Sequence, residues 1–289
     1  MVAQAEGGSA VRWLSFERGG VQSFGYLTAD NGIVDVGSTT SYPDLKAVIA
    51  DNALTRLADL RRNSDFDLDE INYLPPVTNP DKILCVGLNY KAHQEETGRG
   101  GEDFPTIFVR FASAQIGHEE PMIRPLESNT LDFEGEIALV IGKKARRVKS
   151  QDALNYVAGF SIYNDGSVRE YQRHTSQFTP GKNFTGTGAF GPWIVTQEEI
   201  DDPSAFEITT RLNGSVMQNA TANLMVFSFG EIIEYCSTFA DLMPGDVIVT
   251  GTPGGVGVAR NPPVFLDEGD VIEVQIDPIG VLQNTVIVG

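Results

Sequence analysis

Cysteine, basic residues and long apolar runs are all scarce in this sequence, and each shortage excludes a class of protein. Only two of the 289 residues are cysteines, Cys85 and Cys236, and they lie far apart inside apolar runs. We therefore expect two buried thiols in a reducing compartment and no disulfide framework. The 21 basic residues face 39 acidic ones, which gives a net charge of -18. No basic stripe is visible, so no nucleic-acid partner is expected.

Membrane and export signals are also lacking. No apolar run approaches the roughly 20 residues that cross a bilayer, so no membrane association is expected. The first nine residues lack a basic segment followed by an apolar core and do not resemble a signal peptide. We therefore expect a cytoplasmic protein. An anionic substrate would need local positive charge to enter so acidic a molecule.

The order of predicted elements indicates two modules. Residues 11–37 read as short strands separated by turns, and residues 42–62 have the apolar spacing of a helix. A proline-containing stretch at residues 75–80 then interrupts the chain. We predict a small N-terminal α+β module over residues 1–75 and a larger domain over residues 81–289.

The larger domain is predicted to be rich in strands. The expected strands are residues 83–86, 106–111, 136–141, 194–196, 206–212, 246–249 and 271–276. Helices are expected at residues 150–154 and 229–236. Many short strands with few helices argue against a doubly wound parallel sheet. They favour an α+β, β-rich fold with a curved antiparallel or mixed sheet.

The most informative stretch holds two glutamates in a strand pattern. Side chains of a strand alternate between its faces, so Glu134 and Glu136, on either side of Gly135, point the same way. Apolar residues follow, and two like charges entering a core need a positive partner such as Mg²⁺, Mn²⁺ or Ca²⁺. Asp165 ends another apolar stretch and can supply a third oxygen. The alternative is a solvated strand face, because Glu-x-Glu is common by chance.

His93 and Glu96 form a second candidate pair. If their segment is helical, the two side chains are neighbours three residues apart and can meet. A carboxylate beside an imidazole orients it and raises its basicity, as a water-activating base requires. The alternative is an amphipathic surface turn with an incidental histidine.

Cationic residues and a glycine-rich loop form a third group. Arg169, Gln172 and Lys182 can bind a carboxylate, and the loop at residues 250–257, Thr-Gly-Thr-Pro-Gly-Gly-Val-Gly, can present backbone N–H groups to an anion. The loop is not a phosphate-binding P-loop, because no Gly-Lys-Ser/Thr follows its glycines. Its alternative is a tight turn between strands.

Over residues 81–289 the sequence resembles the fumarylacetoacetate hydrolase superfamily, in its acylpyruvate hydrolase and oxo-acid lyase branch. The markers, in order, are Val86-Gly87-Leu88-Asn89-Tyr90, His93 and Glu96, Phe133-Glu134-Gly135-Glu136, Tyr163-Asn164-Asp165-Gly166-Ser167-Val168-Arg169, Gly181-Lys182-Asn183-Phe184 and the loop at residues 250–257. The resemblance implies a β-roll of mixed sheets, preceded here by the small N-terminal module, and a homodimer.

The resemblance also implies roles for single residues. The implied ligands for one Mg²⁺ or Mn²⁺ ion are Glu134, Glu136 and Asp165, with no organic cofactor. The implied catalytic residues are His93 and Glu96, a water-activating dyad on a segment that orders over the site, and Lys182. The positions that match the substrate pocket are Arg110, Arg169, Gln172, Lys182 and Thr252, and relatives often have lysine in place of Arg110.

The activity that we predict is hydrolysis of the carbon–carbon bond of an acylpyruvate, a 2,4-dioxo acid, with release of pyruvate. Maleylpyruvate, fumarylpyruvate and a sugar-derived diketo acid are the candidate substrates. The same residues also suit decarboxylation of an oxaloacetate-like acid, or tautomerisation of an oxo-acid, because these reactions share an enolate. A non-catalytic binding module is a further alternative, but every catalytic position is filled here.

Overall fold

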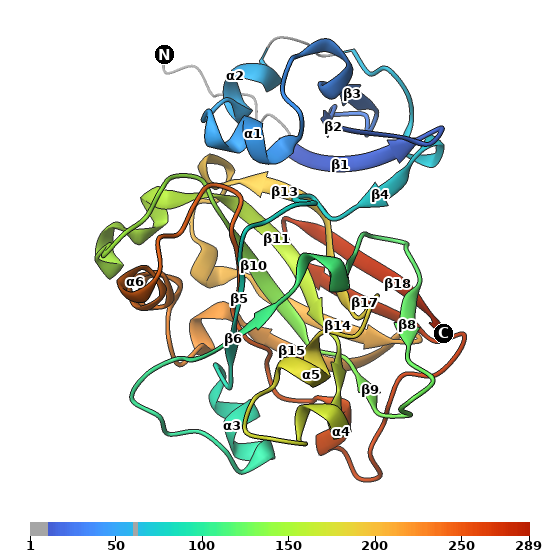
Figure 1. The fold of residues 1–289 in the computed structure, drawn as a ribbon, viewed down its shortest axis with the longest axis vertical. Coiled ribbons are helices and arrows are strands. Elements are labelled where there is room, and N and C mark those ends of the chain that lie inside the picture. The colour runs from blue at the N-terminus through green and yellow to red at the C-terminus, as the bar shows by residue number, and fades with distance from the viewer. Residues whose placement is uncertain (1–10, 60–62) are drawn as a thin grey trace, which may run out of the picture.

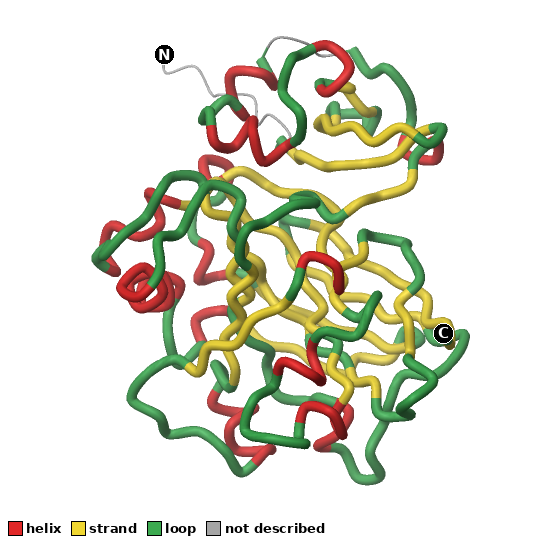
Figure 2. The backbone as a smooth tube through the Cα atoms, in the orientation of Figure 1, coloured by secondary structure: helices red, strands yellow, loops and turns green. Residues whose placement is uncertain are grey.

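The computed structural model describes residues 11–59 and 63–289, which fold into a β-rich body with short helices at its edges (Figures 1 and 2). The helices are α1 (Leu45–Ala50), α2 (Leu54–Ala58), α3 (Lys91–Thr97), α4 (Arg169–Gln172), α5 (Thr179–Lys182) and α6 (Phe229–Phe239). Within these ranges no helix is long and apolar enough to cross a membrane. The first nine residues, for which we expected no export signal, lie outside the described part.

The strands of the described residues form three sheets. The largest sheet contains β1 (Arg12–Arg18), β2 (Val21–Leu27), β3 (Ile33–Asp35), β4 (Asn72–Leu74), β5 (Ile83–Gly87), β6 (Thr106–Arg110), β7 (Gln115–Ile116), β10 (Gly135–Ile141), β11 (Val157–Asp165), β13 (Gly188–Thr196) and β16 (Val247–Val249). A second sheet contains β8 (Met122–Arg124), β14 (Glu207–Leu212), β15 (Ser215–Thr221), β17 (Val271–Ile276) and β18 (Gly280–Val288). β9 (Leu131–Asp132) and β12 (Ser167–Val168) pair separately.

The sheets are mixed, as the sequence predicted. The main path of the largest sheet runs β3-β2-β1-β13-β11-β10-β16-β5-β6. Most neighbours are antiparallel, whereas β16 with β5, β13 with β7, and β18 with β8 are parallel pairs. The β-rich α+β fold class is therefore confirmed.

Strand β10 lies at the centre because it is apolar on both faces. Ile137 and Leu139 face the core shared with the second sheet and α6, whereas Ala138 and Val140 belong to a core that also contains Trp13 from β1. All of these residues are fully buried. A strand that is covered on both faces has a continuous apolar sequence. The glutamates at the start of β10, Glu134 and Glu136, therefore lie where the buried apolar run begins.

The N-terminal module joins the main sheet directly. Trp13 of β1 pairs with Ile194 of β13, and Val48 of α1 belongs to the same core as Val140. Figure 1 shows this module at one end of the molecule, above β13. The predicted boundary at residues 75–81 falls in the link between β4 and β5. The division into two domains stays a prediction.

The predicted helix over residues 42–62 was wrong in its continuity. It is two short helices, because Asn52 between α1 and α2 has a positive φ of 51°, which interrupts helical hydrogen bonding. Residues 60–62 lie outside the described part. The predicted helix at residues 150–154 is a 3₁₀ helix, Ser150–Tyr156. The one at residues 229–236 is confirmed as α6, which begins at a capping box of Ser228 and Glu231.

Candidate active site

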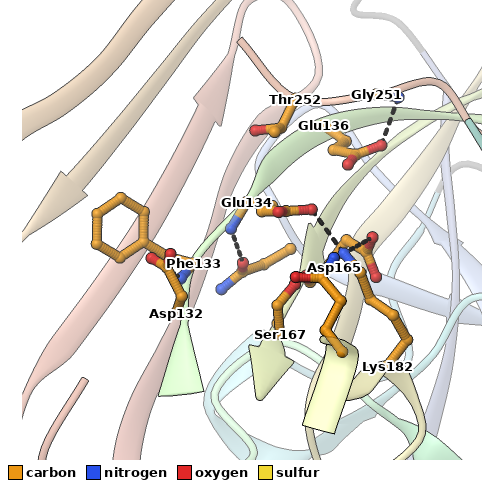
Figure 3. A network of polar contacts seen from close by, with 12 residues as sticks. Asp132, Phe133, Glu134, Glu136, Asp165, Ser167, Lys182, Gly251 and Thr252 are labelled. Carbon is orange, nitrogen blue, oxygen red and sulfur yellow. Dashed lines mark hydrogen bonds and ion pairs between the residues drawn. The ribbon is translucent and has the colours of Figure 1, made fainter. Parts of the chain in front are cut away.

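Three carboxylates meet where β10 begins and β11 ends. The antiparallel register pairs Gly135 with Asn164, and the backbone N–H of Asp165 donates to the carbonyl of Glu134 at 2.8 Å. One carboxylate oxygen from each of Glu134, Glu136 and Asp165 lies within 4.8 Å of the others, and all three residues are buried. Figure 3 shows the three side chains converging. The alternative of a solvated strand face is therefore wrong.

Buried cations surround these carboxylates. The Lys182 Nζ atom, at the end of α5, lies 2.7 Å from Glu134 Oε2 and 2.6 Å from Asp165 Oδ2. Arg169 Nη1 lies 2.6 Å from Glu134 Oε1. Arg110 Nη1 lies 2.6 Å from Asp165 Oδ1. Charges this deeply buried are tolerated only when they are paired in this way.

Glu134 and Glu136 differ in their electrostatic surroundings. Burial alone would raise the pKa of Glu134, but Lys182 and Arg169 outweigh it and hold that pKa below its usual range. Burial, followed by the negative charges of Asp165 and Glu134, raises the pKa of Glu136 well above its usual value. The Glu136 carboxylate accepts a hydrogen bond from the backbone N–H of Gly251 (Figure 3). Among the described residues, Glu136 is thus the triad member without an ion pair, although the charge of Lys182 partly offsets the rise of its pKa.

The donor set fits a divalent cation. All three groups offer hard carboxylate oxygens, which suit Mg²⁺, Mn²⁺ or Ca²⁺. The acidic surroundings that raise the pKa of Glu136 are also what a bound divalent charge would relieve. A buried acidic triad able to hold a divalent metal is thus present.

His93 and Glu96 meet on α3, as the helical interpretation predicted. His93 Nδ1 lies 2.7 Å from Glu96 Oε1, and the other Glu96 oxygen accepts the backbone N–H of Gly255 at 2.8 Å. His93 is only 5% exposed, so the alternative of an incidental histidine on a surface turn is wrong. The Asn89 side chain donates to the carbonyl of Thr250 at 2.8 Å and holds the start of this segment against the glycine-rich loop.

A cavity of about 350 Å³ unites these groups. Seven of the predicted residues line it, namely His93, Glu134, Glu136, Arg169, Gln172, Lys182 and Thr252, whereas Glu96 and Asp165 are not among the described residues that do. Gln172 accepts a hydrogen bond from Arg169 Nη1 at 3.0 Å. The Arg169 Nη2 atom is buried and has no hydrogen-bond partner among the described residues. It is therefore an available donor for an anion in the cavity.

Arg110 lies behind the triad. It is not among the described residues that line the cavity. Its guanidinium instead donates to Asp165, to the carbonyl of Gly166 at 3.0 Å and to the Thr187 hydroxyl at 2.8 Å. The structure thus gives Arg110 contacts that orient Asp165, and the predicted contact with substrate stays a prediction.

Sequence reasoning missed Asp132. This buried carboxylate accepts a hydrogen bond from Arg169 Nε at 2.8 Å. It also accepts hydrogen bonds from the backbone N–H groups of Gly257 and Val258, at 2.8 and 2.9 Å. It therefore links the arginine to the glycine-rich loop, which is more than a tight turn. An acidic residue directly before Phe133 in an apolar strand was the available signal. Two other arginines that line the cavity, Arg99 and Arg173, gave no sequence signal.

Comparisons with known proteins agree with this geometry. Residues 82–287 match the family described as Fumarylacetoacetate (FAA) hydrolase C-terminal. The mitochondrial oxaloacetate tautomerase FAHD2A of Bos taurus is 44% identical over 220 residues, covering 75% of this chain and 70% of that protein. The mitochondrial oxaloacetate tautomerase Fahd2a of Rattus norvegicus is 39% identical over 263 residues, covering 89% and 84%. The solved fumarylacetoacetate hydrolase of Exiguobacterium antarcticum is 35% identical, with a TM-score of 0.83 and coverage of 97% and 100%.

Proposed function

Because the chain belongs to the fumarylacetoacetate hydrolase family, we propose that it interconverts the enol and keto forms of an oxaloacetate-like 2-oxo acid, with a divalent metal. From the sequence, tautomerisation was an alternative to acylpyruvate hydrolysis. The names of the bovine and rat relatives now favour the alternative. The structural observation that carries the proposal is that His93 lines the same small cavity as Glu134 and Glu136, two of the three buried carboxylates of the triad.

The size and charge of the cavity suit a small acid. A volume of about 350 Å³ lies at the lower end of the range for small-molecule sites. Arg169 and Lys182 place positive charge in it despite the net charge of -18. These two groups, with the free Nη2 donor of Arg169, would hold the oxo-carboxylate end of the substrate.

Glu134, Glu136 and Asp165 would hold one Mg²⁺ or Mn²⁺ ion through oxygen. Such a cation, when bound, would polarise the 2-oxo group of the substrate and stabilise negative charge on its oxygen. The buried cations set the geometry of its ligands, since Arg110 fixes Asp165 and Lys182 bridges Glu134 and Asp165. No organic cofactor is needed for this chemistry.

The His93–Glu96 pair would move the proton at carbon 3. In the direction from enol to ketone, the O2–H bond breaks and its proton passes to water, while the Nε2–H bond of a protonated His93 breaks and its proton forms the new C3–H bond; the imidazole then regains a proton from water. Glu96 occupies Nδ1 of His93, which leaves Nε2 to deliver or remove the C3 proton. The backbone N–H of Gly255 fixes Glu96 and so keeps the imidazole in one orientation.

Acylpyruvate hydrolysis is the second candidate, because the same pair can serve it. Here His93 would take a proton from water, which would then attack the distal carbonyl of the acylpyruvate. The short contact between His93 and Glu96 is the observation that favours this reaction. Decarboxylation of oxaloacetate would use the same residues. A non-catalytic module ranks last, since every expected catalytic side chain is in place.

A substrate comparison with the Mg²⁺-loaded protein tests the proposal. Enol-oxaloacetate should convert to the ketone faster than in buffer, followed by the loss of the ultraviolet absorbance of the enol. Pyruvate release from acylpyruvates and from oxaloacetate should be slower, measured with a coupled dehydrogenase. If acylpyruvate cleavage were the fastest reaction on this panel, the tautomerase proposal should give way to the hydrolase.

Assembly and location stay predictions. A homodimer is expected from the family resemblance, and light scattering on the purified protein would measure its mass. The cytoplasmic location expected from the sequence likewise stays a prediction. The names of the bovine and rat relatives place those two proteins in mitochondria.

A further inference from the structure

Two arginines line the cavity without serving the buried carboxylates. Arg99 follows Gly98 at the end of α3, and Arg173 caps the end of α4. Both side chains are exposed although they line the cavity, so they lie at its mouth. Among the described residues, neither guanidinium makes an ion pair or a side-chain hydrogen bond.

The cations at this cavity repel one another, and a bound anion would relieve that repulsion. Partial burial, followed by the like charges of Arg169 and Arg99, lowers the pKa of Arg173. The repulsion occurs in a chain with only 21 basic residues against 39 acidic ones, where unpaired arginines have many possible partners. Two exposed cations that line one cavity and repel each other therefore indicate a binding site for a negative group.

The buried charges in and behind the cavity can balance one carboxylate of a substrate but not a second one. Four buried carboxylates, Asp132, Glu134, Glu136 and Asp165, face three buried cations, Arg110, Arg169 and Lys182. One excess negative charge remains, and a divalent cation would turn it into one positive charge. A single substrate carboxylate neutralises that charge. A second carboxylate on the substrate would have to find its partner elsewhere.

We propose that Arg99 and Arg173 form a distal anion subsite, which holds the second carboxylate of a dicarboxylic 2-oxo acid and selects it over monocarboxylic acids. The inference rests on the proposed function for the choice of a 2-oxo acid as substrate. What it adds is that the substrate has two carboxylates and not one. The two arginines would act in binding rather than in proton transfer. The competing explanation is that each arginine only stabilises the C-terminal end of its short helix.

The test uses two stable ligands that differ only at the distal end. Malate and 2-hydroxybutanoate share a carboxylate and a neighbouring hydroxyl, but malate has a carboxylate where 2-hydroxybutanoate has a methyl group. Calorimetry with the Mg²⁺-loaded protein measures both affinities without turnover. Wild type should prefer malate by about tenfold or more, since a hydrogen bond between charged groups contributes at least this factor.

Arg99→Gln and Arg173→Gln should each reduce the affinity for malate, and the double variant should lose about tenfold. Binding of 2-hydroxybutanoate and of Mg²⁺ should stay unchanged, which also shows that the fold is intact. Lys91→Gln is the matched control, because it removes an exposed positive charge from the same helix outside the cavity lining. An unchanged malate preference in the double variant would overturn the subsite and leave the helix-end explanation.

The outcome separates this inference from the proposed function. A malate preference that depends on both arginines, in a protein without tautomerase activity, supports the subsite and rejects the reaction. Tautomerase activity in a double variant that keeps the wild-type malate preference supports the reaction and rejects the subsite. Raised ionic strength should weaken malate binding more in wild type than in the double variant, because exposed charges are screened.

Discussion

Lys182 lies between two members of the acidic triad, with its Nζ atom 2.6 Å from Asp165 and 2.7 Å from Glu134. It is only 1% exposed. Burial alone would lower the pKa of Lys182, but Asp165 and Glu134 outweigh it and raise that pKa above its usual value. The lysine therefore stays charged and compensates the carboxylates, in addition to any contact with substrate.

The first prediction concerns this compensation. Lys182→Met should lower the free energy of unfolding of the metal-free protein by about 3–5 kcal/mol, because it removes a buried cation shared by Glu134 and Asp165 and leaves each carboxylate with a single arginine. Urea unfolding in the presence of a chelator measures the loss, and Mg²⁺ should restore part of it. The matched control is Lys144→Met, which breaks an exposed ion pair with Asp241. It should cost less than about 1 kcal/mol, and equal losses in both variants would contradict the argument.

The second prediction concerns the metal ligands. Glu136→Gln should weaken Mg²⁺ binding about 100-fold or more, because removing a ligand costs at least as much as removing a group that only supports one. Calorimetry measures the affinity, and circular dichroism checks the fold. Glu268→Gln, at an exposed glutamate outside the site, should bind Mg²⁺ like wild type. Full metal affinity in Glu136→Gln would remove this residue from the ligand set.

The sequence predicted the site best where local patterns decide it. The alternation around Gly135 correctly places Glu134 and Glu136 together, and three-residue spacing correctly pairs His93 with Glu96. Both depend on the geometry of one strand or one helix. The close approach of Asp165 follows from the pairing of β10 with β11, which was supported by the resemblance rather than by spacing.

Features that depend on distant contacts were missed. Asp132 acts by joining Arg169 to backbone groups more than a hundred residues away, and nothing in its neighbours specifies those partners. The same holds for Arg99 and Arg173, which line one cavity although they follow two different helices, α3 and α4. The break at Asn52 was missed because the apolar spacing continues through it, although its backbone leaves the helical region.

The third prediction concerns the segment after α3. Gly98, Gly100 and Gly101 all have positive φ, and such glycines give the backbone freedom to move. We expect trypsin to cut after the exposed Arg99, and Mg²⁺ with oxalate to slow this cut if the segment closes over the site. Mass spectrometry of the fragments measures the rate. A cut after the exposed Lys144 serves as the control and should be unaffected; identical protection at both sites would argue against closure.

The fourth prediction concerns the two thiols. Burial raises the pKa of Cys236 to about 12, and burial together with the negative charges of Asp165 and Glu136 raises the pKa of Cys85 well above its usual value. Since the thiolate is the reactive form, neither residue should react with a thiol reagent at pH 8 in the native protein. Both should react after unfolding in urea. Fast labelling of the native protein would show that a thiol is accessible.

The last prediction concerns the role of His93. Positioned acid–base catalysis contributes about 10²–10⁴-fold, so His93→Ala should slow conversion of enol-oxaloacetate by roughly that factor. Mg²⁺ affinity should barely change, because His93 is not one of the three carboxylates. Glu96→Gln should show a smaller loss, since Glu96 orients the imidazole but does not itself take the proton.

The same variants separate the candidate reactions. In tautomerisation, wild-type protein in deuterium oxide should exchange the C3 hydrogen of oxaloacetate, and His93→Ala should lose this exchange along with turnover. If the protein is instead a hydrolase, His93 is needed to activate water. In His93→Ala, acylpyruvate cleavage would then fall while exchange of the C3 hydrogen of oxaloacetate persisted. Nuclear magnetic resonance measures the exchange. Wild-type exchange and wild-type turnover in His93→Ala would mean that another group moves the proton, and the role proposed for the His93–Glu96 pair would then be wrong.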